Sequence, residues 1–143
     1  MDVLSLLRSK NRCLERFLQV STEYLTEAAR SEQLPDLTIF EAKREAILKA
    51  IALYDRKLSE AVTSLPPGPR PRSLVQAVED SLKEKDLIVH RILLIDDQIL
   101  ARVDAEKTKL LKEMTSNQKK TQAVQKFKSS WISESGEEID EKL

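Results

Sequence analysis

Prolines and glycines occupy only three short places in this chain of 143 residues. Pro35 stands alone, the segment "PPGPRP" at residues 66–71 holds the other four prolines and Gly68, and Gly136 lies near the C-terminus. Because proline and glycine end or weaken helices, the long intervals between these places are typical of uninterrupted helices. A low aromatic content of 4% and abundant Leu, Ala, Glu, Lys and Arg also favour an all-α protein.

Apolar residues recur at spacings of three, four and seven in each interval, which describes one stripe along a helix. The first stripe contains Leu4, Leu7, Leu14, Phe17, Leu18, Tyr24, Leu25 and Ala28. The second contains Leu37, Phe40, Ile47, Ile51, Tyr54, Leu58 and Val62. The third contains Leu74, Val78, Leu82, Ile88, Ile92, Ile95, Ile99, Val103, Leu110 and Met114. Polar residues interrupt each stripe: Asn11 and Ser21 in the first, Arg44 in the second, Lys85 and Glu106 in the third.

These stripes predict helices over residues 2–29, 37–63 and 73–117, with Asp36 and Ser73 as N-caps of the second and third. Helices joined by such short loops pack as an antiparallel up-down-up bundle of three. At ~1.5 Å per residue the third helix is roughly 65 Å long and the others are about 40 Å. We therefore expect the third helix to overhang its neighbours by about 25 Å, so that apolar positions from about Lys107 onward lack partners within the chain.

The C-terminal part continues this helical pattern weakly. Val124, Phe127 and Trp131 form a narrow apolar edge, which predicts a short fourth helix over residues 121–132. The last eleven residues hold five acids and one lysine, which predicts a disordered tail over residues 133–143. A single helical domain over residues 1–132 is expected.

Residues that carry chemistry are scarce. Cys13 is the only cysteine and His90 the only histidine, which excludes an internal disulfide and leaves too few ligands for a zinc site or a nucleophile–base pair. Asp96 and Asp97 are adjacent, but neighbours on a helix point about 100° apart, so we interpret them as solvated or edge charges. With two glycines 68 residues apart, no phosphate-binding loop is present. We expect no catalytic, cofactor or metal site, and no enzyme.

The net charge of +0 argues against a nucleic-acid-binding protein. No apolar run is long enough for membrane insertion, and the first twelve residues, "MDVLSLLRSKNR", do not resemble a signal peptide, so a cytoplasmic location is expected. Residues 106–128 are nevertheless locally basic, with seven lysines against two acids. This run is either a solvated helix face or a surface that attracts an acidic partner. Phe127 and Trp131 either fold back to cover the end of the bundle or anchor a contact with another protein.

Three segments resemble the FliT/FlgN type of flagellar export chaperone, a family of small helical proteins from the bacterial cytoplasm. They are "DLTIFEAKREAILKAI" after the first turn, "RILLIDDQILARVDAEKTKLLKEM" in the third helix, and the basic segment "KKTQAVQKFKSSW" that ends on an aromatic residue. The similarity extends over residues 1–132 as an organisation of long helices, although the family segments end on tyrosine where this chain has Phe127 and Trp131.

The resemblance implies a chaperone that binds the helical terminus of a late flagellar substrate, either a hook-associated or a filament-cap protein. It would prevent premature assembly and deliver the client to components of the type III export apparatus, without a cofactor. The implied contact residues are Val103, Leu110, Met114, Val124, Phe127, Lys128 and Trp131. The alternative is an adaptor module that forms a homodimeric coiled coil through its third and fourth helices.

Overall fold

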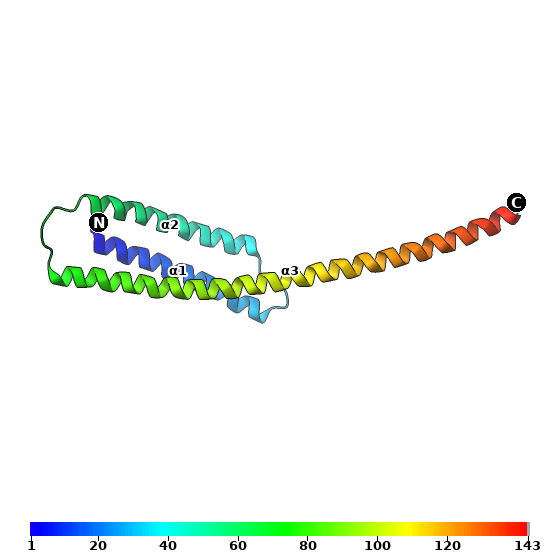
Figure 1. The fold of residues 1–143 in the computed structure, drawn as a ribbon, viewed down its shortest axis with the longest axis horizontal. Helices are drawn as coiled ribbons and strands as arrows, with labels where there is room; N and C mark the ends of the chain where they lie inside the picture. Colours follow the sequence, from blue (N-terminus) through cyan, green and yellow to red (C-terminus); the bar gives the residue numbers. More distant parts are fainter. Residues whose placement is uncertain (143) are drawn as a thin grey trace. The chain divides into compact units, whose positions relative to one another are not determined.

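Helices are the only regular secondary structure among the described residues in a computed structural model, which describes residues 1–142, with side chains for residues 1–130. Helix α1 spans Val3–Arg30, α2 spans Leu37–Thr63 and α3 spans Arg72–Lys142 (Figure 1). No strand occurs among the residues described. The all-α class predicted from the sequence is therefore confirmed.

Two compact units make up the chain. Met1–Val103 contains α1, α2 and the first part of α3, and Asp104–Leu143 contains the rest of α3. Within the first unit the three helices lie side by side (Figure 1). The sequence predicts one domain over residues 1–132, and that boundary stays a prediction.

Aspartates begin the first two helices. The Asp2 carboxylate accepts a hydrogen bond from the backbone N–H of Ser5 at 2.7 Å, and this bond lowers the pKa of Asp2 below its ordinary value. The Asp36 carboxylate accepts from the N–H of Thr38 at 2.8 Å. Each aspartate satisfies a donor that the helix itself leaves unpaired, so the cap predicted at Asp36 is confirmed.

The start of α3 differs from the prediction. Ser73 lies inside the helix, which begins at Arg72. The carbonyl of Pro71 accepts hydrogen bonds from the N–H groups of Leu74 and Val75, both at 3.1 Å. Proline has no N–H to satisfy and its φ is already helical, so Pro71 takes the capping position two residues before Ser73. The preceding turn passes through Gly68, whose φ of 130° is accessible to glycine and strained for other residues.

A separate fourth helix is not observed. Where the sequence analysis ends one helix at residue 117 and begins another at 121, α3 continues without a break. The intervening residues, Gln118, Lys119 and Lys120, include no proline or glycine and have good helix propensity, so nothing there ends the helix. The disordered tail expected over residues 133–143 falls where side chains are outside the described residues, and it stays a prediction.

Most of the buried core of Met1–Val103 lies in two clusters in which all three helices take part. The first contains Leu14, Phe17, Ile47, Ile88 and Ile92, and the second contains Tyr24, Phe40 and Ile99. All eight belong to the stripes predicted from the sequence. Ala28 and Leu6 are buried as well, and Leu6 lies outside the predicted stripe, whose residues Leu4 and Leu7 are only half-buried. The Tyr24 and Phe40 rings stack with centroids 4.1 Å apart, and the Tyr24 hydroxyl donates to the carbonyl of Pro35 at 3.0 Å. Burial raises the pKa of this phenol, which favours the protonated, donating form.

Contacts between helices follow a regular order. Lys10 near the start of α1 pairs with Asp55 near the end of α2 at 2.6 Å, whereas Tyr24 later in α1 stacks on Phe40 early in α2. These contacts indicate that α1 and α2 run in opposite directions. Between α1 and α3, early residues contact early ones and late residues contact late ones: Asn11 bonds to Ser81, and Tyr24 packs with Ile99. The register of the first unit is thus fixed by residues at both ends of α1.

Two polar interruptions of the first stripe are buried. The Asn11 amide nitrogen donates to the backbone carbonyl of Ser81 at 2.9 Å and lies 3.1 Å from the Ser81 hydroxyl, so this polar pair links α1 to α3. Ser21 is fully buried, and its hydroxyl has no hydrogen-bond partner among the described residues. A buried hydroxyl without a partner opposes folding, whereas a bonded one does not.

We expect Ser21→Ala to raise the free energy of unfolding by about 1 kcal/mol, because it removes an unbonded buried hydroxyl and adds helix propensity. Urea unfolding followed by circular dichroism measures this change. Ser9→Ala is the matched control: Ser9 is also buried in α1, but its hydroxyl accepts a hydrogen bond from Arg12 at 2.9 Å, so its loss brings no gain. A less stable Ser21→Ala variant would contradict the prediction.

Candidate binding surfaces

Side chains that could bind a metal ion or act in catalysis form no cluster among the described residues. Among the residues described, no three His, Cys, Asp or Glu side chains are close enough to hold a metal ion. His90 is exposed on α3, and Cys13 is a free, half-buried thiol on α1. The surfaces that remain as candidate sites are therefore apolar or charged faces of helices.

Arg44 and Asp96 meet between α2 and α3, although the sequence analysis treats them as an interruption and an edge charge. Arg44 Nη2 donates to Asp96 Oδ2 at 3.1 Å, and Nη1 forms an ion-pair contact of 3.0 Å with Oδ1. The Arg44 guanidinium carbon also lies 4.4 Å from the ring centroid of Phe17 and 5.0 Å from that of Phe40. Arg44 thus contacts Phe17 on α1, Asp96 on α3 and Phe40 on its own helix, so its side chain links all three helices of the first unit.

Most of the predicted contact residues are exposed on the helix of the second unit. Leu110 is 50% exposed, Met114 59%, Val124 51% and Phe127 73%. Lys128 is also exposed, and the side chain of Trp131 lies outside the described residues. Every residue from 107 to 130 is exposed, and we call this stretch of α3 the lysine-rich segment. Its apolar side chains have no partner among the described residues of their own unit.

Val103 differs from the other predicted contact residues. It is half-buried and packs against the core cluster of Tyr24, Phe40 and Ile99. Its branched side chain therefore belongs to the core of the first unit. Sequence spacing does not separate it from Leu110, because the two lie exactly one heptad apart on the same stripe.

A first groove runs between α2 and α3 in Met1–Val103, with a volume of ≈ 530 Å³. Its apolar lining includes Leu48 and Leu100, which are 50% and 59% exposed. Two exposed acids, Glu41 and Glu45, line it on the α2 side. We call it the α2/α3 groove; its charged lining is mainly acidic because Arg44 is paired with Asp96.

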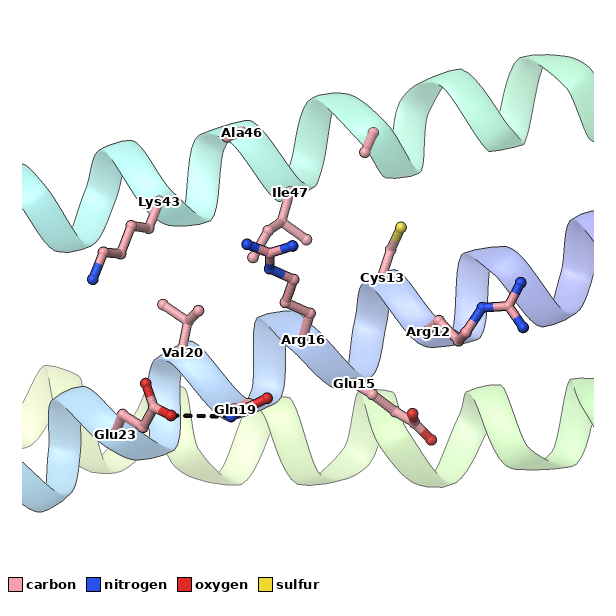
Figure 2. A pocket seen from close by; sticks show the side chains of 11 residues that line it. Arg12, Cys13, Glu15, Arg16, Gln19, Val20, Glu23, Lys43, Ala46 and Ile47 are labelled. Carbon is pink, nitrogen blue, oxygen red and sulfur yellow. Dashed lines mark hydrogen bonds between the residues drawn. The ribbon is translucent and has the colours of Figure 1, made fainter.

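A second groove, between α1 and α2, has a volume of ≈ 860 Å³ (Figure 2). It is lined by Cys13, Val20 and Ile47 together with the cations Arg12, Arg16 and Lys43. We call it the α1/α2 groove. The sequence analysis does not predict either groove, because each depends on how two helices are placed beside one another.

No helix in the described part of the chain has a stretch long and apolar enough to cross a membrane. Comparison with protein-family models, with curated proteins and with solved structures gave no match.

Proposed function

We propose that this protein is a non-enzymatic chaperone that binds an amphipathic helix of a client protein. The observation that carries the proposal is the lysine-rich segment, in which five large apolar side chains are at least half exposed on one helix. Covering such side chains with the apolar face of a client helix would contribute about 1–2 kcal/mol for each. Exposed apolar groups among polar ones are a common feature of helix-binding surfaces.

The client class comes from the resemblance to FliT/FlgN-type chaperones. We propose a hook-associated or filament-cap protein in the bacterial cytoplasm, whose helical terminus would assemble prematurely if left uncovered. The chaperone would hold that terminus and deliver it to the export apparatus. An antiparallel up-down-up bundle, which the order of contacts in Met1–Val103 supports, would give the chain a packed helical unit in addition to the binding helix.

Self-association is the second candidate function, and one observation favours it. Val103, Leu110, Asn117, Val124 and Trp131 recur every seven residues, as at the core positions of a coiled coil. Charge argues against it: residues 106–128 hold seven lysines and two acids, so two copies of this helix would repel each other. We therefore place client binding first.

The proposal is tested by retention of purified hook-associated and filament-cap proteins on the immobilised full-length chain. We expect one of them to bind, and the double variant Val124→Ala with Phe127→Ala to bind it roughly tenfold or more weakly, since hot-spot truncations each cost about 1–2 kcal/mol. The control is Leu87→Ala, which removes an apolar side chain that is 62% exposed in the first unit.

Two results would contradict the chaperone function. One is that no flagellar substrate is retained, and the other is that the double variant binds like the unmodified protein. Light scattering on the same samples addresses the alternative. A stable dimer that the double variant loses would instead favour a self-associating module.

A further inference from the structure

We propose that the α1/α2 groove is a docking surface for an acidic amphipathic helix of a partner protein. The groove lies within Met1–Val103, apart from the residues assigned above to client binding. The inference does not depend on the flagellar client. It follows from the shape, the apolar lining and the charges of the groove.

The apolar lining suits a helix because it is continuous along α2. Ala46 and Ala50 line the groove, and helical spacing puts Ile39 and Leu53 on the same face of α2. Ile39 and Leu53 are 58% and 44% exposed, so large apolar side chains stand on either side of two small ones. Beyond Lys43 the groove is followed by a smaller pocket of ≈ 210 Å³ that Ile39 and Val20 line. A helix seated over the alanines would contact apolar groups along several turns.

The positive charges that line the α1/α2 groove favour a negatively charged partner helix. Arg12 and Arg16 from α1 and Lys43 from α2 line the groove, and neither Arg16 nor Lys43 has an ion pair or hydrogen bond among the described residues. Figure 2 shows the Arg16 side chain rising toward Ile47 of α2, and Lys43 extending from α2 toward α1. Covering these cations without providing carboxylates would cost their hydration, so an acidic helix is favoured over a neutral or basic one.

The acids of the groove offset this charge only in part, because two acids, Glu15 and Glu23, line it against three cations. Figure 2 shows Glu15 directed away from α2, and Glu23 accepts a hydrogen bond from Gln19 on its own helix at 3.1 Å. The α2/α3 groove has the opposite character, since its lining holds three acids against one cation, Arg44, although Glu45 also contacts Lys49 of α2 at 3.6 Å. The two grooves of the first unit therefore favour helices of opposite charge, which would allow two different partners to be bound without competition.

The test uses the full-length chain and a fluorescent synthetic peptide of about 20 residues, long enough to form an amphipathic helix. The peptide carries Leu and Ala on one face and Glu on both flanks, and a counterpart carries Lys in place of Glu. Fluorescence anisotropy measures binding at physiological salt. We expect the acidic peptide to bind and the lysine peptide not to bind, and we expect the double variant Arg16→Glu with Lys43→Glu to weaken binding roughly tenfold or more.

A matched control separates the groove from general attraction to lysines. Lys112→Glu with Lys119→Glu changes the net charge by the same amount but alters the lysine-rich segment, and we expect it to leave binding unchanged. Ala46→Trp fills the groove at an exposed position without changing charge, and we expect it to weaken binding to a similar extent as the groove variant. Circular dichroism of each variant checks that it remains helical.

Several outcomes would overturn the proposal. They are an acidic peptide that does not bind, equal binding by the groove variant and the unmodified protein, or a loss in the Lys112/Lys119 control equal to that in the groove variant. Unchanged binding by Ala46→Trp would show that the peptide is not seated in the groove. Self-association, or binding to phosphatidylserine vesicles, that only the groove variant loses would assign the surface to a second copy or to a membrane.

Discussion

Arg44→Ala is expected to lower the free energy of unfolding by about 2–3 kcal/mol. Arg44 pairs with a carboxylate on α3 while lying over aromatic rings from two helices, Phe17 and Phe40. Removing it leaves Asp96 without its cation in a half-buried position and removes two cation–π contacts of roughly 0.5–1 kcal/mol each. The expected loss is below the 3–5 kcal/mol typical of fully buried pairs, because the two side chains are 22% and 27% exposed.

A double-mutant cycle isolates the pair itself. With Arg44→Met and Asp96→Leu, which keep much of the apolar bulk, we expect a coupling energy of about 1–2 kcal/mol from urea unfolding. The control cycle uses Lys49→Ala and Glu45→Ala. This pair joins neighbouring turns of α2 at 3.6 Å, with side chains 77% and 69% exposed, and should couple by less than about 0.5 kcal/mol.

Equal coupling in the two cycles would contradict the central role of Arg44. Arg44→Lys gives a further check on geometry, because lysine keeps the charge but has no planar fork to contact both carboxylate oxygens. We expect it to recover less than half of the stability lost in Arg44→Ala.

The sequence is sufficient to predict α1 and α2 because the signals for them are local. Proline and glycine mark the turns, Asp36 supplies a cap to its own helix, and spacing within one helix identifies Phe17 or Ile47 as core residues. The cap at Ser73 and the break after residue 117 were predicted wrongly for a local reason as well. Several residues can begin or end a helix at such places, and in α3 the backbone carbonyl of Pro71 accepts the first hydrogen bonds of the helix.

The Arg44–Asp96 pair could not be derived in the same way. Each residue interrupts or borders the stripe of its own helix, and only the relative register of α2 and α3 makes them partners. The sequence nevertheless contains one indication of the pair: two opposite charges, Arg44 and Asp96, at the margins of two apolar stripes. The α1/α2 groove is not predictable for the same reason, because its cations Arg16 and Lys43 belong to different helices. The exposure of Leu110, Met114 and Val124 agrees with the expectation that apolar positions after about Lys107 lack partners within the chain, and their role as contact residues stays a prediction.

Phe17 and Phe127 both lie on apolar stripes predicted from the sequence, but Phe17 is buried and Phe127 is exposed. Replacing each by alanine therefore tests which stripe residues belong to the core and which to the surface. We expect Phe17→Ala to lower the free energy of unfolding by about 3–5 kcal/mol, because the ring is 5% exposed among Leu14, Ile47 and Ile92. Phe127 is 73% exposed, so we expect Phe127→Ala to change the free energy of unfolding by less than about 0.5 kcal/mol.

Thermal and urea unfolding of the two variants measure these changes under the same conditions. The result for Phe127 decides between the two roles left open by the sequence. If Phe127→Ala were to destabilise the protein by more than about 1 kcal/mol, the ring would be covered by the chain itself and would be part of its core. If stability is unchanged while client retention falls, the ring contributes free energy only when a partner covers it. That combination is what a binding residue requires, and a core residue cannot produce it.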